Sequence, residues 1–181
     1  EIPLRLVGSE MCIRDSVMTN PVALDTWKTL GSNATPMAFA EVFPALEIKA
    51  LDGQENPLQH MYANKMQEVQ KYISLTNHVY TPVALVASKK FWDRLSESDR
   101  AGLRKAATEA GLLQRKLLDE GDAEVIGKFK AAGVQVDALS AADVARIQDK
   151  VKPVVAKFTP VIGEEFVQGF YTEIEQARKA K

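Results

Sequence analysis

Residues 52–56, Asp-Gly-Gln-Glu-Asn, place two carboxylates and two amides within one short turn. A carboxylate accepts hydrogen bonds and an amide both donates and accepts them, so this turn can hold a small polar molecule through several contacts. Nothing near it supplies a nucleophile with its base, a set of metal ligands or a glycine-rich phosphate loop. The pattern indicates binding without chemical conversion, and we expect no cofactor.

Two other functions remain open at this point. Glu55 and His78 could act as an acid–base pair in a small α/β enzyme, although no motif supplies a nucleophile or an activated water. The chain could also be a helical scaffold that acts only through protein contacts, because a long helix is predicted from Ser96 to Phe129. That interpretation leaves the polar turn at 52–56 without a role.

The overall charge argues against an electrostatic partner. The chain has 23 basic and 24 acidic residues and a formal net charge of −1. Proteins that bind nucleic acid or anionic membranes through charge need an excess of basic residues. We therefore expect no nucleic acid partner.

Residues 1–16, EIPLRLVGSEMCIRDS, show neither helical nor strand periodicity. The stretch resembles a translated sequencing adapter, so we expect it to be non-native and to pack poorly. Residues 13–17 can still occupy a strand position, because backbone pairing depends little on side-chain identity. Without residues 1–16 the acidic and basic residues are equal in number and the only cysteine, Cys12, is lost. A part without cysteine suits an oxidising compartment, and the missing signal peptide says nothing about location.

The remaining sequence alternates β-leaning runs with helical patterns, which predicts an α/β domain. Asn20 followed by Pro21 is typical of a helix start, and Ser96 with Asp99 and Ser140 with Asp143 resemble capping boxes. Strands are expected at 34–37, 72–75, 83–87 and 134–136, and helices at 21–30, 39–46, 57–67, 96–129, 140–158 and 166–174.

Several motifs resemble those of the DctP-type solute receptors of TRAP transporters, the tripartite ATP-independent periplasmic systems that import organic acids. The matching residues are Pro36 to Phe39, Glu41, Ala45–Leu46, Asp52 to Pro57, Glu68 to Tyr72 and Thr76 to His78. Their order and spacing agree with the family pattern throughout. The resemblance extends from Val17 to about Lys181, roughly the C-terminal half of a receptor.

The resemblance implies a fold like that of periplasmic binding proteins, in which the chain passes more than once between two α/β lobes. Residues 17–81 would form most of the second lobe. Residues 82–121 would belong to the first lobe and include the start of a long helix spanning both lobes, and residues 122–181 would return to the second. The chain is thus expected to be a fragment, mainly the second lobe with the interlobe helix.

The resemblance also implies a set of substrate-binding residues: Asn56, Phe39, Thr19, Glu55 and His78. Asn56 would contact the bound acid, and Phe39 would pack against it. Glu55 and His78 would form a polar pair deeper in the pocket. Each has a simpler alternative role, since Asn56 could only cap a helix, Phe39 fill the core and His78 be structural. Thr19 and Asn20 precede a helix N-terminus, which attracts anions, and can also serve as caps. Asp52 and Glu41 are interpreted as structural.

One position departs from the family pattern. Receptors of this type carry an arginine that pairs with the ligand carboxylate, and the family spacing places it at Ser16. Arg14 is two residues out of register and is not expected to take that role. Loss of such a bidentate contact costs binding energy, so the chain as written is expected to bind organic acids poorly.

The mechanism that the resemblance implies is capture by closure of two lobes, followed by delivery to membrane permease subunits. The location would be the periplasm, and no ATP site is expected. The ligand would be a C4-dicarboxylate or a related carboxylate, without a choice among organic acids.

Overall fold

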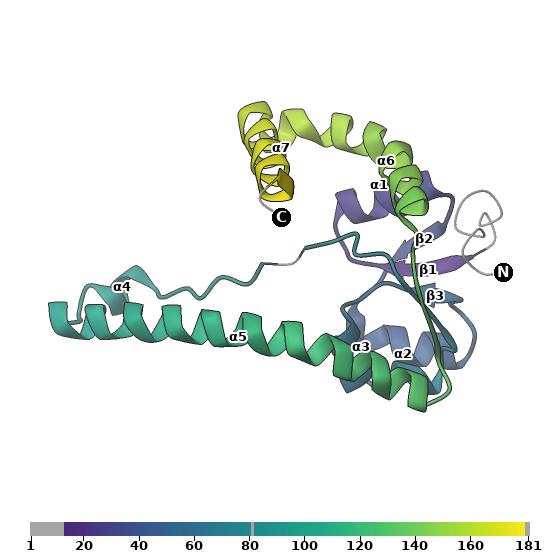
Figure 1. Ribbon diagram of the computed structural model, residues 1–181, viewed down its shortest axis with the longest axis horizontal. Helices are drawn as coiled ribbons and strands as arrows, with labels where there is room; N and C mark the ends of the chain where they lie inside the picture. The colour runs from purple at the N-terminus through teal and green to yellow at the C-terminus, as the bar shows by residue number, and fades with distance from the viewer. Residues whose placement is uncertain (1–12, 81, 180–181) are drawn as a thin grey trace.

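The computed structural model describes residues 13–80 and 82–179, the side chain of Asp119 excepted. In its first part β1 (Arg14–Val17), α1 (Pro21–Leu30), β2 (Asn33–Pro36), α2 (Phe39–Glu47) and β3 (Gly53–Gln54) alternate. There follow α3 (Leu58–Ala63), the 3-10 helix η1 (Met66–Glu68) and β4 (Tyr72–Leu75). The chain continues with α4 (Lys89–Trp92), α5 (Glu97–Ala131), β5 (Gln135–Ala138), α6 (Ala141–Ile162) and α7 (Glu164–Lys179), as Figure 1 shows.

The helix starts follow the local sequence signals. The side chain of Asn20 accepts a hydrogen bond from the Ala23 backbone N–H at 2.8 Å, and Pro21 is the first residue of α1. Gly31 ends α1 with a φ of 112°, in the left-handed region that glycine adopts without strain. Ser96 and Ser140 accept from the backbone N–H groups of Asp99 and Asp143, each at 3.1 Å. The predicted caps are therefore confirmed.

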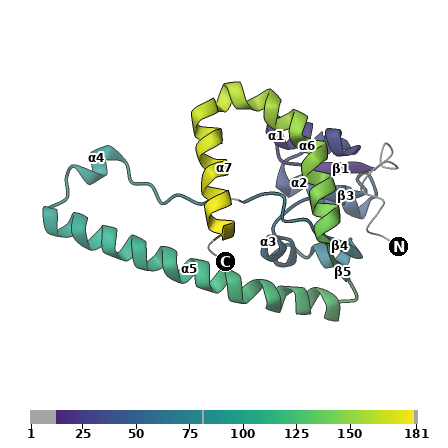
Figure 2. The ribbon, with the colours of Figure 1, turned by 45° about the horizontal axis from the view of Figure 1, so that its top comes forward.

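Two sheets, each made of parallel strands, form the centre of the fold. The first has the strand order β2-β1-β3, and the second pairs β4 with β5. In the first sheet α1 lies on one side, together with α6, and α2 and α3 lie on the other, as Figures 1 and 2 show. The predicted α/β architecture is confirmed, with helices in excess of strands.

The main core lies among α2, α3, β4, β5 and the carboxyl-terminal part of α5. Its largest fully buried side chain is Phe129, which is 0% exposed and meets the Tyr62 ring edge-on at a centroid distance of 5.3 Å. The cluster consists of Val42, Leu46, Leu51, Met61, Met66, Ile73, Val125, Phe129 and Val134. This packing holds α2, α3 and α5 against the second sheet.

Helix α6 packs separately against α1. Val154 is buried, and the Lys150 ammonium donates to the Leu30 carbonyl at 3.1 Å, near the end of α1. Lys157 pairs with Asp25 of α1 at 2.5 Å. Residues far apart in the sequence thus cover one side of the first sheet.

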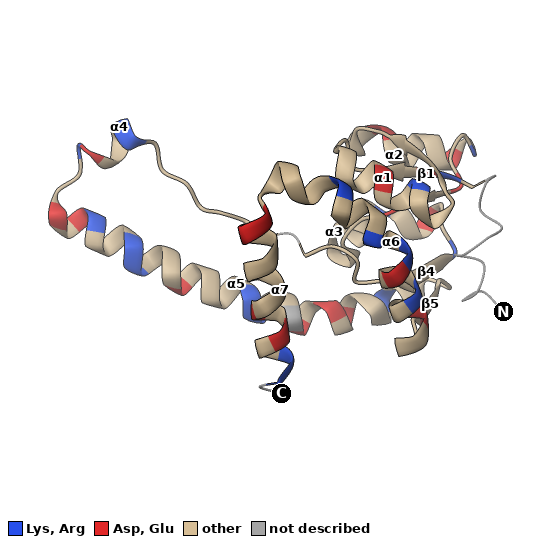
Figure 3. Cartoon of the chain, turned by 90° about the horizontal axis from the view of Figure 1, so that it is seen from above, with Lys and Arg blue, Asp and Glu red and all other residues tan. Residues whose placement is uncertain are grey.

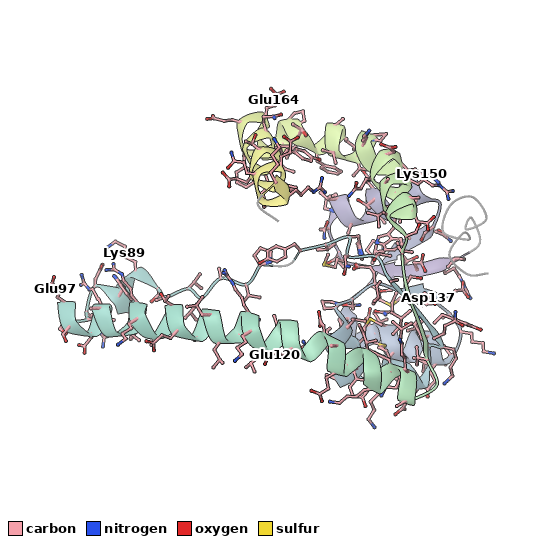
Figure 4. The ribbon with its side chains drawn as sticks, in the orientation of Figure 1. Lys89, Glu97, Glu120, Asp137, Lys150 and Glu164 are labelled. Carbon is pink, nitrogen blue, oxygen red and sulfur yellow. The ribbon has the colours of Figure 1, made fainter. Side chains whose placement is uncertain are left out.

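The amino-terminal half of α5 leaves this body. Figure 4 shows the section between Glu97 and Glu120 projecting away from the sheets, with α4 beside its far end. Lysines and carboxylates alternate along α5 in Figure 3, and pairs such as Lys105–Glu109 and Lys116–Glu120 lie one turn apart. Exposed pairs of this kind contribute only a few tenths of a kcal/mol, about 0.3–0.5 each. No helix in the described ranges is long and apolar enough to cross a membrane.

Three expectations about local structure are wrong. Residues 83–87 form no strand, and Val83 and Leu85 are 87% and 83% exposed. The helix expected over 57–67 ends at Ala63, because Lys65 takes a φ of 60° and a short 3-10 turn follows. Finally, Arg14 to Ser16 do not pack poorly: with Val17 they form the central strand, paired with both neighbours, which is the strand position that residues 13–17 were expected to be able to occupy. The expected foreign origin of residues 1–16 stays a prediction, and residues 1–12 lie outside the described residues.

Replacing Phe129 with alanine should destabilise the chain strongly. The side chain is fully buried, so the change removes its burial and leaves a cavity, at a cost of about 3–5 kcal/mol in the free energy of unfolding. Phe166→Ala is the matched control, because Phe166 is 69% exposed and its loss should cost about 0.5 kcal/mol or less. Urea denaturation followed by circular dichroism would measure both. Equal losses in the two variants would contradict the assigned core.

Candidate functional site

The candidate residues lie where parallel strands end. Thr19 follows β1, Phe39 follows β2, and Glu55 and Asn56 follow β3 directly. In a parallel α/β sheet the carboxyl ends of the strands share one edge, where ligands bind beside the strand at which the order reverses. Here that strand is β1, since the chain places β2 on one side of it and β3 on the other.

Glu55 and His78 are in direct contact at this edge. The Glu55 Oε2 and His78 Nε2 atoms are 3.3 Å apart, and Glu55 Oε1 accepts from the Met18 backbone N–H at 3.2 Å. The Thr76 hydroxyl lies 2.6 Å from His78 Nδ1. The Glu55 side chain is only 9% exposed. The contacts connect the segments that follow β1, β3 and β4, so they tie the first sheet to the second.

The local backbone explains how Thr76 and His78 meet. Asn77, between them, has a φ of 47°, in the left-handed region that asparagine tolerates better than most residues. This bend turns His78 back towards Thr76. Because Thr76 lies at Nδ1 and Glu55 at Nε2, both imidazole nitrogens of His78 have partners within the protein. The Trp27 ring of α1 packs edge-on against His78, with ring centroids 5.2 Å apart.

Asn56 belongs to a chain of side-chain amides. Its amide nitrogen donates to Gln54 Oε1 at 2.7 Å, and the Gln54 amide nitrogen donates to Gln70 Oε1 at 3.1 Å. Pro57 is the N-cap of α3, and no side chain caps that helix. The alternative role of Asn56 as a helix cap is therefore wrong for this structure. In the described part of the chain, no hydrogen bond is donated to the Asn56 side-chain oxygen, and its contact with a ligand stays a prediction.

Phe39 lies at the start of α2 and packs against the protein interior. It is half-buried against the core cluster, and its ring lies on the imidazole of His60, with centroids 4.1 Å apart and planes inclined at 40°. The core-filling role is thus present, and the ligand-facing role stays a prediction. Phe39 has no recorded ring contact with His78, so the structure shows two groups of side chains and their convergence on one ligand stays a prediction.

Asn20 caps α1, whereas Thr19 is exposed beside the Glu55 contact at Met18. In the described residues, no group of three or more His, Cys, Asp or Glu side chains could hold a metal ion. A separate open hollow of about 610 Å³ lies near the amino end of β3 and is lined by Phe43, Leu46, Glu47, Lys49, Leu51, Asp52, Glu68 and Val69. None of the five candidate residues lines it, so the hollow is not assigned to the ligand.

Arg14 and Asp52 hold the amino end of the same strands. The guanidinium donates to both Asp52 carboxylate oxygens at 2.9 Å and to the Lys49 carbonyl at 2.8 Å. The Arg14 and Asp52 backbones add two further bonds, each of 2.9 Å. The side-chain hydrogen bond from Arg14 lowers the pKa of Asp52 to about 2. Arg14 is thus committed to the turn, whereas Ser16 is buried in the strand position next to Gln54.

Comparison with known proteins decides the family. Residues 13–160 match the sequence profile described as bacterial extracellular solute-binding protein, family 7, also called DctP. The chain belongs to this family. The match includes residues 13–16, within the stretch that resembles an adapter.

Three relatives illustrate the family. The chain is 41% identical over 117 residues to the 2,3-diketo-L-gulonate-binding periplasmic protein YiaO of Escherichia coli, covering 65% of this chain and 36% of that protein. It is 31% identical to the C4-dicarboxylate-binding periplasmic protein DctP of Rhodobacter capsulatus, covering 91% of this chain and 50% of that protein. The sugar acid binding protein DctPAm of Advenella mimigardefordensis, solved with galactonate, matches 97% of this chain and 55% of its own at 40% identity and a TM-score of 0.82. The chain thus spans about half the length of these relatives or less.

Sequence reasoning missed four members of the candidate site: Gln54, Thr76, Trp27 and His60. Gln54 and Thr76 lie inside the family motifs, so their polar side chains were an available signal. His60 lies in the first turn of α3, shortly after the motif at 52–57, and this closeness in sequence was the available signal. Trp27 had no such signal, because only the packing of α1 brings it to His78.

The Arg14–Asp52 pair should make stability depend on pH at acid values. The pKa of Asp52 is lowered from 3.8 to about 2 in the folded chain, so its ionised form stabilises the fold above 3.8 and this stabilisation is lost as the pH falls towards 2. Asp52→Asn should lower stability at neutral pH and lose less on acidification. Arg14→Met removes the same ion pair by deleting its cation, so the stability of this variant should also depend less on pH. Urea denaturation at several pH values would measure this, and parallel profiles for all three proteins would contradict it.

Proposed function

We propose that this chain is the larger part of the second lobe of a TRAP-type solute receptor that captures an organic acid. The observation that carries the proposal is the set of amide, carboxylate and imidazole side chains at the carboxyl edge of a parallel sheet in a solute-binding family. Such groups hydrogen-bond a polar ligand without supplying a nucleophile. The family description and the relatives named above are all of binding proteins.

The chemistry of the site favours a hydroxylated sugar acid over a simple dicarboxylate. Amides and imidazoles pair with hydroxyl groups in either direction, as donors or acceptors. A second ligand carboxylate near Glu55 would instead meet a like charge within a part-buried site, which is unfavourable. The relatives at 40% and 41% identity bind galactonate and 2,3-diketo-L-gulonate, whereas the C4-dicarboxylate-binding relative is 31% identical.

Burial along α5 supports the proposed division into lobes. Near its carboxyl end Val125 and Phe129 are buried, whereas Leu113 and Leu117 are both 57% exposed. The change occurs near Gly121, at the boundary between residues 82–121 and 122–181. We assign residues 17–81 and 122–181 to the second lobe. The exposed apolar side chains of 82–121 would pack against a first lobe supplied by the rest of a full-length receptor.

The proposed mechanism is closure of the two lobes on the acid and delivery to membrane permease subunits from the periplasm. Ligand binding shifts the population towards the closed form by its preference for that form. The two relatives from Escherichia coli and Rhodobacter capsulatus are named as periplasmic, which supports this location.

The enzyme alternative is disfavoured by the family, because the family description and the named relatives are of binding proteins. Incubation of a full-length protein that contains this chain with galactonate, followed by chromatography of the acid, discriminates the two functions. A receptor returns the acid unchanged, and formation of a product would establish an enzyme.

Asn56→Ala should weaken acid binding in a receptor that contains this chain. The change removes the free side-chain oxygen at the strand edge and leaves Gln54 Oε1 without its donor, at a cost of about 1–3 kcal/mol. Asn64→Ala is the matched control, because Asn64 bonds only the His60 carbonyl within its own helix and should bind as the parent does. Isothermal titration with galactonate measures both variants. An unchanged dissociation constant for Asn56→Ala would reject the site.

Restoring arginine at position 16 together with a first lobe should create strong acid binding. Two parallel N–H donors of a guanidinium match the two oxygens of a carboxylate, whereas the lysine control offers a point charge. Ser16→Arg alone should achieve little, because the open site leaves the ion pair screened by water. The thermal shift caused by galactonate would be measured for Ser16→Arg alone and for Ser16→Arg combined with a first lobe. Strong acid binding by the unrepaired chain would contradict the role given to this position.

A further inference from the structure

The chain has two histidines, and the structure places them in opposite situations. His78 has partners on both ring nitrogens, Thr76 at 2.6 Å and Glu55 at 3.3 Å. His60 is exposed, and within residues 13–80 and 82–179 its ring nitrogens have no hydrogen-bond partner, while its backbone carbonyl serves Asn64. His60 therefore retains one donor and one acceptor for a molecule from solution.

The position of His60 relates it to the candidate site. It lies in α3, four residues after Asn56, and its ring contacts Phe39 at a centroid distance of 4.1 Å. Phe39 directly follows Ala38 at the carboxyl side of β2, while α3 begins just after β3. The contact thus joins the segments that leave the two outer strands of the first sheet. Packing on Phe39 also restricts the imidazole, so less entropy is lost when it forms a further hydrogen bond.

We propose that His60 is a ligand-contacting residue that determines specificity for hydroxylated acids over acids without hydroxyl groups. This inference rests on the proposed function. The Phe39 ring offers an apolar face to the C–H groups of the carbon chain, and the adjoining imidazole offers a hydrogen bond to a hydroxyl group on it. An acid without hydroxyl groups meets the same apolar face and leaves the imidazole unpaired, so His60 contributes little to its affinity.

The test is an NMR titration of the 181-residue chain, with labelled histidine ring nitrogens, against millimolar galactonate and succinate. Millimolar acid suits the weak affinity expected of a chain with serine at position 16. Galactonate should shift the ring nitrogen signals of His60 more than succinate does. His60→Phe retains an aromatic ring on Phe39 but removes both ring nitrogens. It should weaken galactonate binding about three- to tenfold, the usual effect of one hydrogen bond, and leave succinate binding unchanged.

A conservative variant separates contact from structure. His60→Gln supplies an amide donor and acceptor and should recover part of the preference for galactonate. Equal effects of His60→Phe on both acids would overturn the inference. So would galactonate binding that perturbs His78 and the Asn56 amide while His60 stays unchanged, and that result would leave the proposed function standing. No perturbation at any of the three residues by either acid would overturn both.

Discussion

The backbone pairing of β1 with both neighbours determines where the candidate residues lie. All four residues of Arg14–Val17 pair with β2 on one side, and Asp15 and Ser16 pair with β3 on the other, all in parallel. Parallel pairing brings the segments after the three strands to one edge, so Thr19, Phe39 and Glu55 all follow strand ends at that edge despite their separation in sequence. At the opposite end the Arg14–Asp52 pair holds β1 against the approach to β3. If β1 were absent, β2 and β3 would have no common partner.

The charges around the candidate site bear on the proposed binding of an acid. Glu55 is a part-buried carboxylate whose partners are a backbone N–H and an imidazole. A ligand anion in its neighbourhood needs a compensating cation, and position 16, buried beside Gln54, carries a serine. The guanidinium of Arg14 does not compensate, because it already serves Asp52 and Lys49. If an acid binds as proposed, neither Ser16 nor Arg14 thus supplies it with a guanidinium.

Local signals in the sequence predicted local structure well. Asn20, Ser96 and Ser140 cap helices as expected, and Tyr72–Leu75 is a strand with the predicted bounds. Residues 83–87 have β-leaning composition but no strand to pair with, because strand formation depends on a neighbour more than on propensity. Arg14–Ser16 show the converse: their composition gave no strand signal, yet two parallel neighbours pair with them. The Glu55–His78 pair was predicted from the family motifs, whereas the Phe39–His60 contact depends on how α2 and α3 pack and could not be predicted from spacing.

The central claim is that an acid binds at the carboxyl edge of the first sheet. Intermolecular nuclear Overhauser effects between galactonate and the labelled chain test it most directly, because each effect requires protons only a few ångströms apart. The account predicts contacts from galactonate to the Phe39 ring and to the side-chain amide of Asn56. Contacts confined to Phe43 and Val69, in the hollow near the amino end of β3, would contradict it.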